Sequence, residues 1–303
     1  MRRSFLSASL IALCPAVALA EPAGFETPNA AVAAVVEALE GRDRDRLVAI
    51  FGPESESVIL SGDPGRDRAD WVAFYEAYQQ MHRIVPSDDG TEAVLYIGQE
   101  QWPFPIPVRL SSGVWQFDPA AGAEEITARR IGENELDVIE LMRDYTRVQA
   151  AFRQIDYDND GIMEFAEGIL SDPGERNGLY WPPEAGTPES PIGDFVARAA
   201  AAGYTVNGVT NEPEPFLGYY YKLLTEQGEG APGGAHNYLV NGSMVGGHAL
   251  IAFPSAYGET GIMSFKVGEN GVVYEADLGE DTLTLGAATQ SYNPVDPWTP
   301  VAE

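Results

Sequence analysis

The sequence has one cysteine, three histidines and few basic residues, and each shortage excludes a class of protein. Cys14 is the only cysteine of the 303 residues, so no disulfide forms within the chain and the rest of it has no cysteine nucleophile. Its 18 lysines and arginines stand against 46 aspartates and glutamates, a formal net charge of -28 at pH 7. Nucleic acid is excluded as a partner, because phosphate binding requires a basic surface. A surface this acidic favours cations or basic partners.

Long apolar runs are also missing, apart from one near the N-terminus. Arg2 and Arg3 precede an apolar stretch at 5–17, and the Ala-Leu-Ala site at 18–20 leads to Glu21, which is the pattern of a cleavable secretion signal. The stretch is too short to span a bilayer. We therefore expect a periplasmic or secreted protein without stable membrane insertion. Whether export uses the Sec or the twin-arginine route stays open.

Motifs that carry catalysis are absent as well. The chain has no G-x-S-x-G sequence, and the glycine-rich stretch at 228–234 lacks the Lys-Ser/Thr pair of a phosphate-binding loop. His236 and His248 flank a predicted Asn-Gly turn at 241–242, where alternation along the strands places them on opposite faces of the hairpin. A zinc site needs three or four convergent ligands. The sequence therefore predicts no catalytic and no cofactor-binding residue.

The elements that are present predict an α+β fold in three parts. Residues 1–20 form the signal peptide, 21–122 an α+β module, and 123–303 a module of helix, acidic loop and antiparallel sheet. The first module has predicted helices at 30–39, 43–51 and 68–80, and predicted strands at 57–60, 93–98, 106–110 and 114–117. This order resembles the ketosteroid-isomerase-like cone, a curved sheet wrapped on helices.

The second module begins with a predicted amphipathic helix at 134–155. Val138, Met142 and Tyr145 follow a spacing of three to four residues, and Asn134 is suitably placed to cap the first turn. Alternating strands predict an antiparallel meander packed on this helix, with strands at 218–224, 236–240, 243–246, 249–253, 263–267 and 272–276. The module therefore predicts a helix-on-sheet layer.

An acidic loop follows this helix and matches the template D-x-[DN]-x-[DN]-G-x5-E in full. Alternate residues of a tightly curled loop point inward, and hard oxygen ligands suit calcium. The predicted calcium ligands are Asp156, Asp158, Asp160, Ile162 through its carbonyl group, and Glu167. Gly161 provides the sharp turn that the template requires.

Two alternatives to a complete calcium-binding hand stay open for this loop. Aspartates also favour turns because they bond to their own backbone, so the loop could be a solvated turn without metal. A short predicted exit helix at 164–170, and the lack of a second loop, favour a stand-alone calcium loop over a paired sensor. In that form the metal would have a structural role.

Distinctive short sequences occur along nearly the whole chain: WPFPIP at 102–107, RRIGENEL at 129–136, GLYWP at 178–182, SPIG at 190–193, GYYY at 218–221, APGGA at 231–235, and GVVY at 271–274 with DLG at 277–279. Together they resemble a secreted bacterial family of unknown function, domain of unknown function 2950. This resemblance implies an envelope or secreted protein and no activity. The C-terminal half is also similar to the globular part of pseudopilins, although the filament-forming hydrophobic stalk is missing.

These patterns lead to one preferred function and one alternative. We expect a soluble extracytoplasmic binding or structural protein that is stabilised by calcium, is not an enzyme, and has an envelope protein or a cell-wall component as its partner. The alternative is an envelope enzyme or small-ligand carrier with a pocket in the first module. A deep apolar pocket holding a buried carboxylate would favour this alternative.

Overall fold

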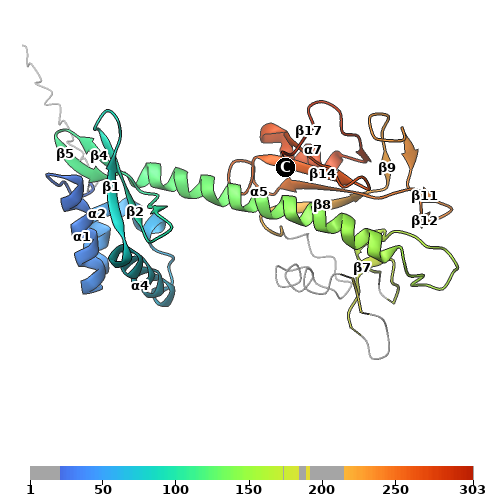
Figure 1. Ribbon diagram of the computed structural model, residues 1–303, viewed down its shortest axis with the longest axis horizontal. Helices are drawn as coiled ribbons and strands as arrows, with labels where there is room; N and C mark the ends of the chain where they lie inside the picture. Colours follow the sequence, from blue (N-terminus) through green and yellow to red (C-terminus); the bar gives the residue numbers. More distant parts are fainter. Residues whose placement is uncertain (1–20, 173, 184–188, 192–214, 303) are drawn as a thin grey trace, which may run out of the picture. The chain divides into compact units, whose positions relative to one another are not determined.

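The chain folds into two compact units, Met1–Ile126 and Thr127–Glu303. The computed structural model describes residues 21–172, 174–183, 189–191 and 215–302, so the predicted signal at 1–20 lies outside the described residues (Figure 1). The boundary between the units falls within one long helix, α5 (Pro119–Phe152). Each unit has its own hydrophobic core. The architecture is α+β, as predicted.

Helices open the first unit, and side-chain caps mark where three of them begin. They are α1 (Pro28–Gly41), α2 (Arg44–Phe51), the 3-10 turn η1 (Pro53–Ser55), α3 (Glu56–Ile59) and α4 (Pro64–Gln80). The three capped helices are α1, α2 and α4. The hydroxyl group of Thr27 accepts a hydrogen bond from the amide of Ala30, and the carboxylate of Asp63 accepts one from Gly65. The predicted strand at 57–60 is wrong, because this segment forms α3.

An antiparallel sheet completes the first unit. Its strands are β1 (His82–Pro86), β2 (Glu92–Ile97), β3 (Trp102–Pro103), β4 (Val108–Ser111) and β5 (Val114–Phe117), in the order β1-β2-β4-β5 with β3 paired to β2. The turn between β4 and β5 has Ser112 and Gly113 at positive φ, as a tight hairpin requires. The predicted hairpin is therefore confirmed.

Aromatic rings fill the core of the first unit. The ring centre of Phe51 on α2 lies 4.6 Å from that of Phe117 on β5 and 6.3 Å from that of Phe104. Phe51 and Phe117 are each 3% exposed. Ile106 closes the same core, where it lies so near Gly122 of α5 that a Cβ on that glycine would come within 2.6 Å. These contacts leave the unit with a closely packed, apolar interior.

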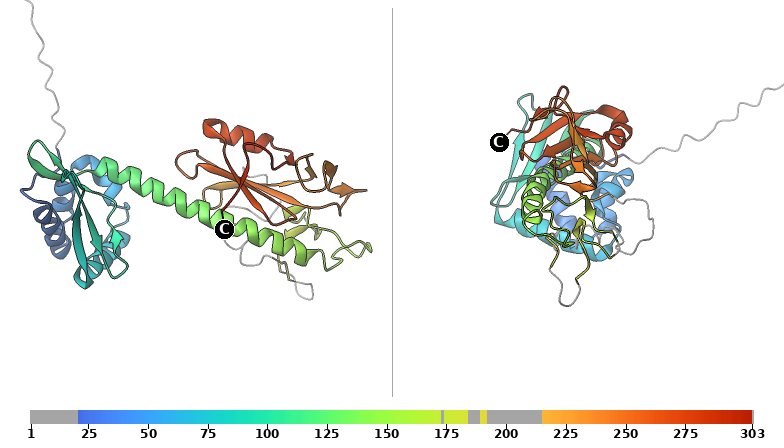
Figure 2. Two further views of the ribbon diagram at one scale, coloured as in Figure 1. Left: turned by 45° about the horizontal axis from the view of Figure 1, so that its top comes forward. Right: turned by 90° about the vertical axis from the view of Figure 1, so that its right-hand side faces the viewer.

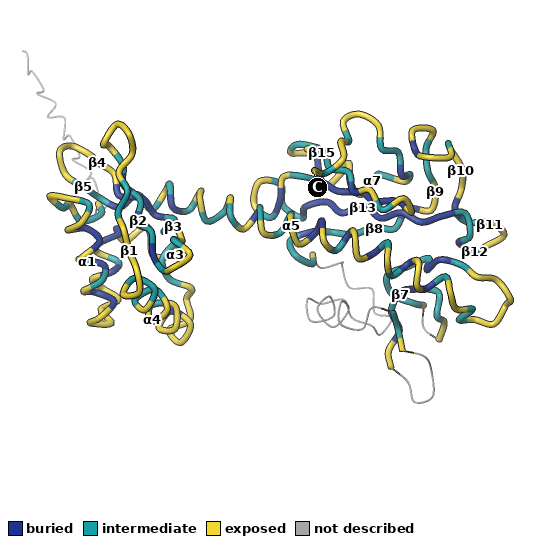
Figure 3. The backbone as a smooth tube through the Cα atoms, in the orientation of Figure 1, coloured by how far each residue is buried: buried dark blue, intermediate teal, exposed yellow. Residues whose placement is uncertain are grey.

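A five-stranded antiparallel sheet forms the centre of the second unit. Its order is β17 (Thr299–Pro300), β15 (Val273–Asp277), β14 (Met263–Gly268), β13 (Ala249–Pro254) and β8 (Tyr219–Leu224). Every residue of β13, which lies between β14 and β8, is buried (Figure 3). The predicted meander is therefore confirmed for β13, β14 and β15, and the structure adds β17, which was not predicted. The predicted strands at 236–240 and 243–246 are not part of this sheet, because β8 pairs directly with β13.

Helices cover both faces of this sheet, as Figure 2 shows. On one face, Val138, Met142 and Tyr145 of α5 are buried against apolar residues of the strands. On the other, the helix α7 (Thr282–Ala288) contacts β13, where Gly286 lies under the ring of Phe253. The predicted helix-on-sheet layer is confirmed for α5, whereas α7 was not predicted.

The helix α5 begins at Pro119, 15 residues before the predicted start. Its first turn is capped by Asp118, whose carboxylate accepts a hydrogen bond from the amide of Ala121 (3.0 Å). Asn134 is not a cap but an interior residue, and its side-chain amide donates to the carbonyl of Thr260 (2.8 Å). Glu135 beside it accepts hydrogen bonds from two successive amides at 262–263 (2.8 and 2.9 Å). The RRIGENEL sequence thus ties α5 to the loop before β14.

Short strands connect the remaining parts of the second unit. They are β6 (Gly168–Leu170) parallel to β7 (Gly178–Tyr180), β9 (Glu226–Gln227) between β10 (His236–Asn237) and β16 (Ser291–Tyr292), and the hairpin of β11 (Leu239–Val240) and β12 (Ser243–Met244). The hairpin turns at Asn241 and Gly242, both at positive φ. The predicted Asn-Gly turn is confirmed.

Candidate metal centre

The acidic loop begins where α5 ends in a tightened turn, since the amide of Ile155 donates to the carbonyl of Phe152 (3.2 Å). Its carboxylates then curl the loop. Gly161 donates its amide N–H to Oδ2 of Asp156 (2.9 Å), and Ile162 donates to Oδ1 of Asp160 (2.7 Å). Gly161 has a φ of 87°, which favours glycine at this position. The sharp turn required by the calcium template is therefore present.

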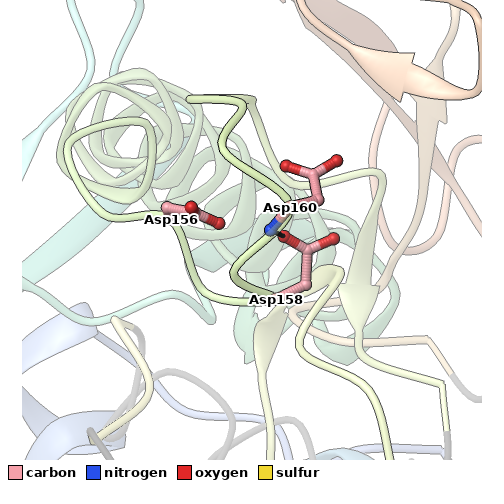
Figure 4. A group of neighbouring side chains, drawn as sticks. All are labelled: Asp156, Asp158 and Asp160. Carbon is pink, nitrogen blue, oxygen red and sulfur yellow. Dashed lines mark hydrogen bonds between the residues drawn. The ribbon is translucent and has the colours of Figure 1, made fainter.

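The loop brings three of the predicted ligands together (Figure 4). Asp156, Asp158 and Asp160 each offer one carboxylate oxygen, and these oxygens all lie within 4.8 Å of one another. The Oδ1 atom of Asp156 is buried and has no hydrogen-bond partner, whereas Asp158 and Asp160 are exposed. A buried, unpaired carboxylate oxygen is costly. Three ionised carboxylates at this separation also repel one another, and a divalent cation would offset both costs.

Glu167 lies outside this group of three carboxylates. Its amide donates to the carbonyl of Asn177 (2.8 Å). Burial raises the pKa of the Glu167 carboxyl, and the charges of Asp172 and Glu175 raise it further. These neighbours belong to the segment after the loop. Ile162, the predicted carbonyl ligand, is a residue that is 41% exposed.

Glu164 is a carboxylate of this region that the sequence analysis did not single out. Burial raises the pKa of Glu164, and the charge of Asp158 is the next cause, ahead of Glu167 and Asp160. Its side chain also hydrogen-bonds to Ser243 of β12. Position 9 of the calcium template, which often binds through water, falls on this residue. That position is the signal that would have identified it.

The segment after the loop is not the predicted exit helix at 164–170, which is wrong. Its last part is the strand β6, and the amide of Phe165 donates to the carbonyl of Met244 on β12 (2.8 Å). Ala166 is held by Gln149 of α5, whose side-chain amide accepts from its N–H (2.9 Å) and donates to its carbonyl (3.0 Å). Helix α5 and the β11–β12 hairpin therefore fix the end of the loop.

A buried histidine lies behind this segment. His248 is 1% exposed, and its ring packs edge-on against Phe165 (4.6 Å between ring centres) and Tyr145 (5.2 Å). Burial lowers the pKa of His248 to about 4, with a smaller contribution from the charge of Arg153. His236 is exposed and bonds to backbone carbonyl groups. Neither histidine belongs to the group of three aspartates.

Fold and site together define an α+β protein with a candidate calcium loop between its long helix and a short parallel strand pair. The chain belongs to the family described as "Protein of unknown function (DUF2950)", which matches residues 23–301. The resemblance found in the sequence is thereby confirmed. No curated protein and no solved structure matches the chain. None of the helices in the described residues has the length and apolar character needed to cross a membrane.

Proposed function

We propose that this chain is an extracytoplasmic, non-catalytic binding or structural protein whose second unit is stabilised by calcium in the loop at 156–167. The observation that carries the proposal is that one carboxylate oxygen from each of three aspartates lies within 4.8 Å of the other two. One of these aspartates, Asp156, also has a buried oxygen, Oδ1, without a hydrogen-bond partner. Calcium takes six to eight oxygen ligands in flexible geometry, and carboxylate and carbonyl oxygens suit it. Asp156, Asp158 and Asp160 would supply the first three.

The remaining protein ligands come from the second half of the loop. The carbonyl of Ile162 holds position 7 of the template, and Glu167 holds position 12. Glu164 is a competing carboxylate, since the charges of Asp158 and Asp160 act on it. Comparing the calcium affinities of Glu164→Gln and Glu167→Gln decides between them, because removing a direct ligand weakens binding more than removing a nearby charge.

A structural role for the metal follows from the anchored ends of the loop. Gln149 and β12 hold its C-terminal end, so an ion bound at 156–162 ties that end to α5. A ligand that binds only the folded state at ten times its dissociation constant adds about 1.4 kcal/mol to the free energy of unfolding. For a unit of this size, that raises the melting temperature by about 4 °C.

The test is a thermal melt of the mature chain with calcium chloride and then with a chelator. We expect the melting temperature of the second unit to rise with calcium and to return with the chelator. Asp156→Asn should abolish the shift, while Glu229→Gln, an exposed acid elsewhere in the same unit, should keep it. A wild-type melting curve that does not respond to excess calcium would remove the proposal and leave the solvated turn.

The closely packed first unit supports the proposal that the protein is not a catalyst. Phe51 and Phe117 fill the centre of that unit, which disfavours a ligand-carrying pocket there.

Export of the protein from the cytoplasm is proposed from the signal pattern at 1–20. The export test is cell fractionation of the full chain followed by N-terminal sequencing. We expect the protein outside the cytoplasm with Glu21 as its first residue. Recovery in the cytoplasm with Met1 retained would contradict export.

A further inference from the structure

The C-terminal segment at 293–301, here called the C-terminal strap, covers part of the sheet of the second unit. It leaves β16 at Asn293 and returns to the edge of the sheet as β17, where Val301 donates its amide to the carbonyl of Val273 (2.9 Å). Between these points, Trp298 donates to the carbonyl of Val295 (3.0 Å). The strap is thus attached to the sheet region at both ends and contains a hydrogen-bonded turn between them.

Lys266 lies beneath the strap in the middle of β14 and is 3% exposed. Its Nζ atom donates to the carbonyl of Asn293 (2.7 Å) and lies 3.9 Å from the centre of the Trp298 ring. Both partners belong to the strap. When the strap lies in place, it therefore removes the ammonium group from water, and only a carbonyl and an aromatic face replace the lost hydration.

No salt bridge joins Lys266 to a carboxylate among the residues that the structure describes. Its cross-strand neighbours on the same face are Ile251 on β13 and Tyr274 on β15, and Tyr292 of β16 packs against Tyr274. On β8, beyond Ile251, Lys222 donates to the carbonyls of Ala287 and Thr289, which end α7. The one acid of the strap, Asp296, is exposed.

We propose that the C-terminal strap is a pH-sensitive cover, which opens locally when Lys266 is protonated and closes more tightly once Lys266 has lost its proton. A closed strap holds an ammonium ion without a carboxylate, and opening returns that ion to water. Neutral Lys266 carries no such cost. The contact with Trp298 reduces the cost without removing it, because a cation over an aromatic ring recovers only part of a hydration shell.

The direction of the pH effect follows from the two protonation equilibria. Burial lowers the pKa of Lys266 to about 7 in the closed form, against 10.5 for a solvated lysine. Between these values the open form binds more protons than the closed form, so the closed form gains about tenfold in its favour for each unit of rising pH. From about pH 6 to about pH 9, the opening constant should fall about a hundredfold.

The experiment is residue-resolved amide exchange of the full mature chain, expressed as protection factors so that the intrinsic pH dependence of exchange cancels. Trp298 and Val301 report strap opening, and Ile251 in β13 reports global unfolding. In the wild type, we expect strap protection to rise about a hundredfold over this pH range while remaining below that of β13. Lys222→Met, which removes the other carbonyl-bound lysine of this face, should keep the rise.

Two substitutions of Lys266 should each remove the pH dependence of strap protection, one leaving protection high and the other leaving it low. Lys266→Met should give a strap that is well protected at every pH, and Lys266→Arg, whose guanidinium stays charged, should give one that is poorly protected at every pH. Each variant is first shown to be folded by the protection of β13. The proposal is overturned if wild-type strap protection is independent of pH, or if the rise survives in Lys266→Met. Equal protection of strap and β13 overturns it too, because opening would then be global.

Discussion

The cores of the two units differ in their polar content. In the first unit the described buried polar residues are Ser55 and Asp67, both beside helix ends. In the second they are Gln149, His248, Ser264, Lys266 and Thr282. Two of these, His248 and Lys266, have strongly lowered pKa values. Buried polar groups therefore contribute more to the core of the second unit, where two buried bases are kept neutral more readily than in water, than to the mainly apolar core of the first.

The largest expected effect tests the apolar half of this comparison. Phe51→Ala removes a ring at the centre of the first unit, and the lost burial and the resulting cavity should lower its free energy of unfolding by about 4 kcal/mol. Urea denaturation followed by amide exchange in β2 measures the loss. Val72→Ala, at a position 48% exposed, should change it by less than about 0.5 kcal/mol. A small loss for Phe51→Ala would mean that the packing is loose.

The next effect tests the dependence of the second unit on pH. Its His248 has a pKa near 4, below the ordinary 6.5, so between these values the unfolded state binds more protons than the folded one. This difference in proton binding contributes up to about 3 kcal/mol to the free energy of unfolding. The contribution is complete above about pH 6.5 and is lost as the pH falls to about 4. Stability curves of the wild type and His248→Phe, subtracted from each other, isolate it from the carboxylates.

His236→Gln, at an exposed histidine of the same unit, is measured in the same way as a control for the loss of a histidine. If the difference in free energy of unfolding between the wild type and His248→Phe were independent of pH, the protonation of His248 would not contribute to the contrast between the two cores.

Gln149→Leu tests the buried hydrogen bonds and should cost about 2 kcal/mol. The substitution introduces an apolar side chain of similar size and leaves both the N–H and the carbonyl of Ala166 without their partner. Gln154→Leu, whose amide donates only to its own helix at an exposed site, should cost less than about 0.5 kcal/mol. Equal costs for the two variants, measured by urea denaturation, would show that Ala166 finds other partners.

The smallest expected effect concerns the contact between α5 and the loop before β14. Glu135→Gln keeps an oxygen acceptor for the amides at 262–263 but removes its charge, so we expect a loss of about 1 kcal/mol. Glu133→Gln, exposed on the same helix, is the control. Faster amide exchange at Ile262 and Met263 in Glu135→Gln alone would locate the loss. No change there would assign the stability of this loop to Asn134 instead.

The strand and helix periods were sufficient to predict the main layers of the second unit. The alternation in β13, β14 and β15 gave the meander, and the Asn241-Gly242 turn gave the separate β11–β12 hairpin, since both signals are local. The start of α5 was missed although Asp118 and Pro119 form an ordinary capping pair. Asn134 was an equally good cap by composition, and only its contact with Thr260, 126 residues away, shows its actual role.

The polar interior could not be predicted, because tertiary contacts bury it. Lys266 lies in a strand of alternating residues, and that alternation alone does not say whether its side chain faces solvent or core. The side chain is buried because a strap some 30 residues later in the sequence covers it. His248 likewise depends on Phe165 and Tyr145 from two other segments. The three aspartates were found from spacing alone because their loop is local. Glu164 was passed over because the template places its closing carboxylate at position 12.

The double hydrogen bond between Gln149 and Ala166 limits how the loop can change in length. The side chain of Gln149 hydrogen-bonds to both the N–H and the carbonyl of Ala166, as a peptide group of a neighbouring strand would. Its own position is fixed because it lies on a turn of α5. An inserted or deleted residue between Phe152 and Ala166 would bring a different residue opposite Gln149 unless the exposed part at 158–163 absorbed the change. Related chains should therefore keep the number of residues in this loop.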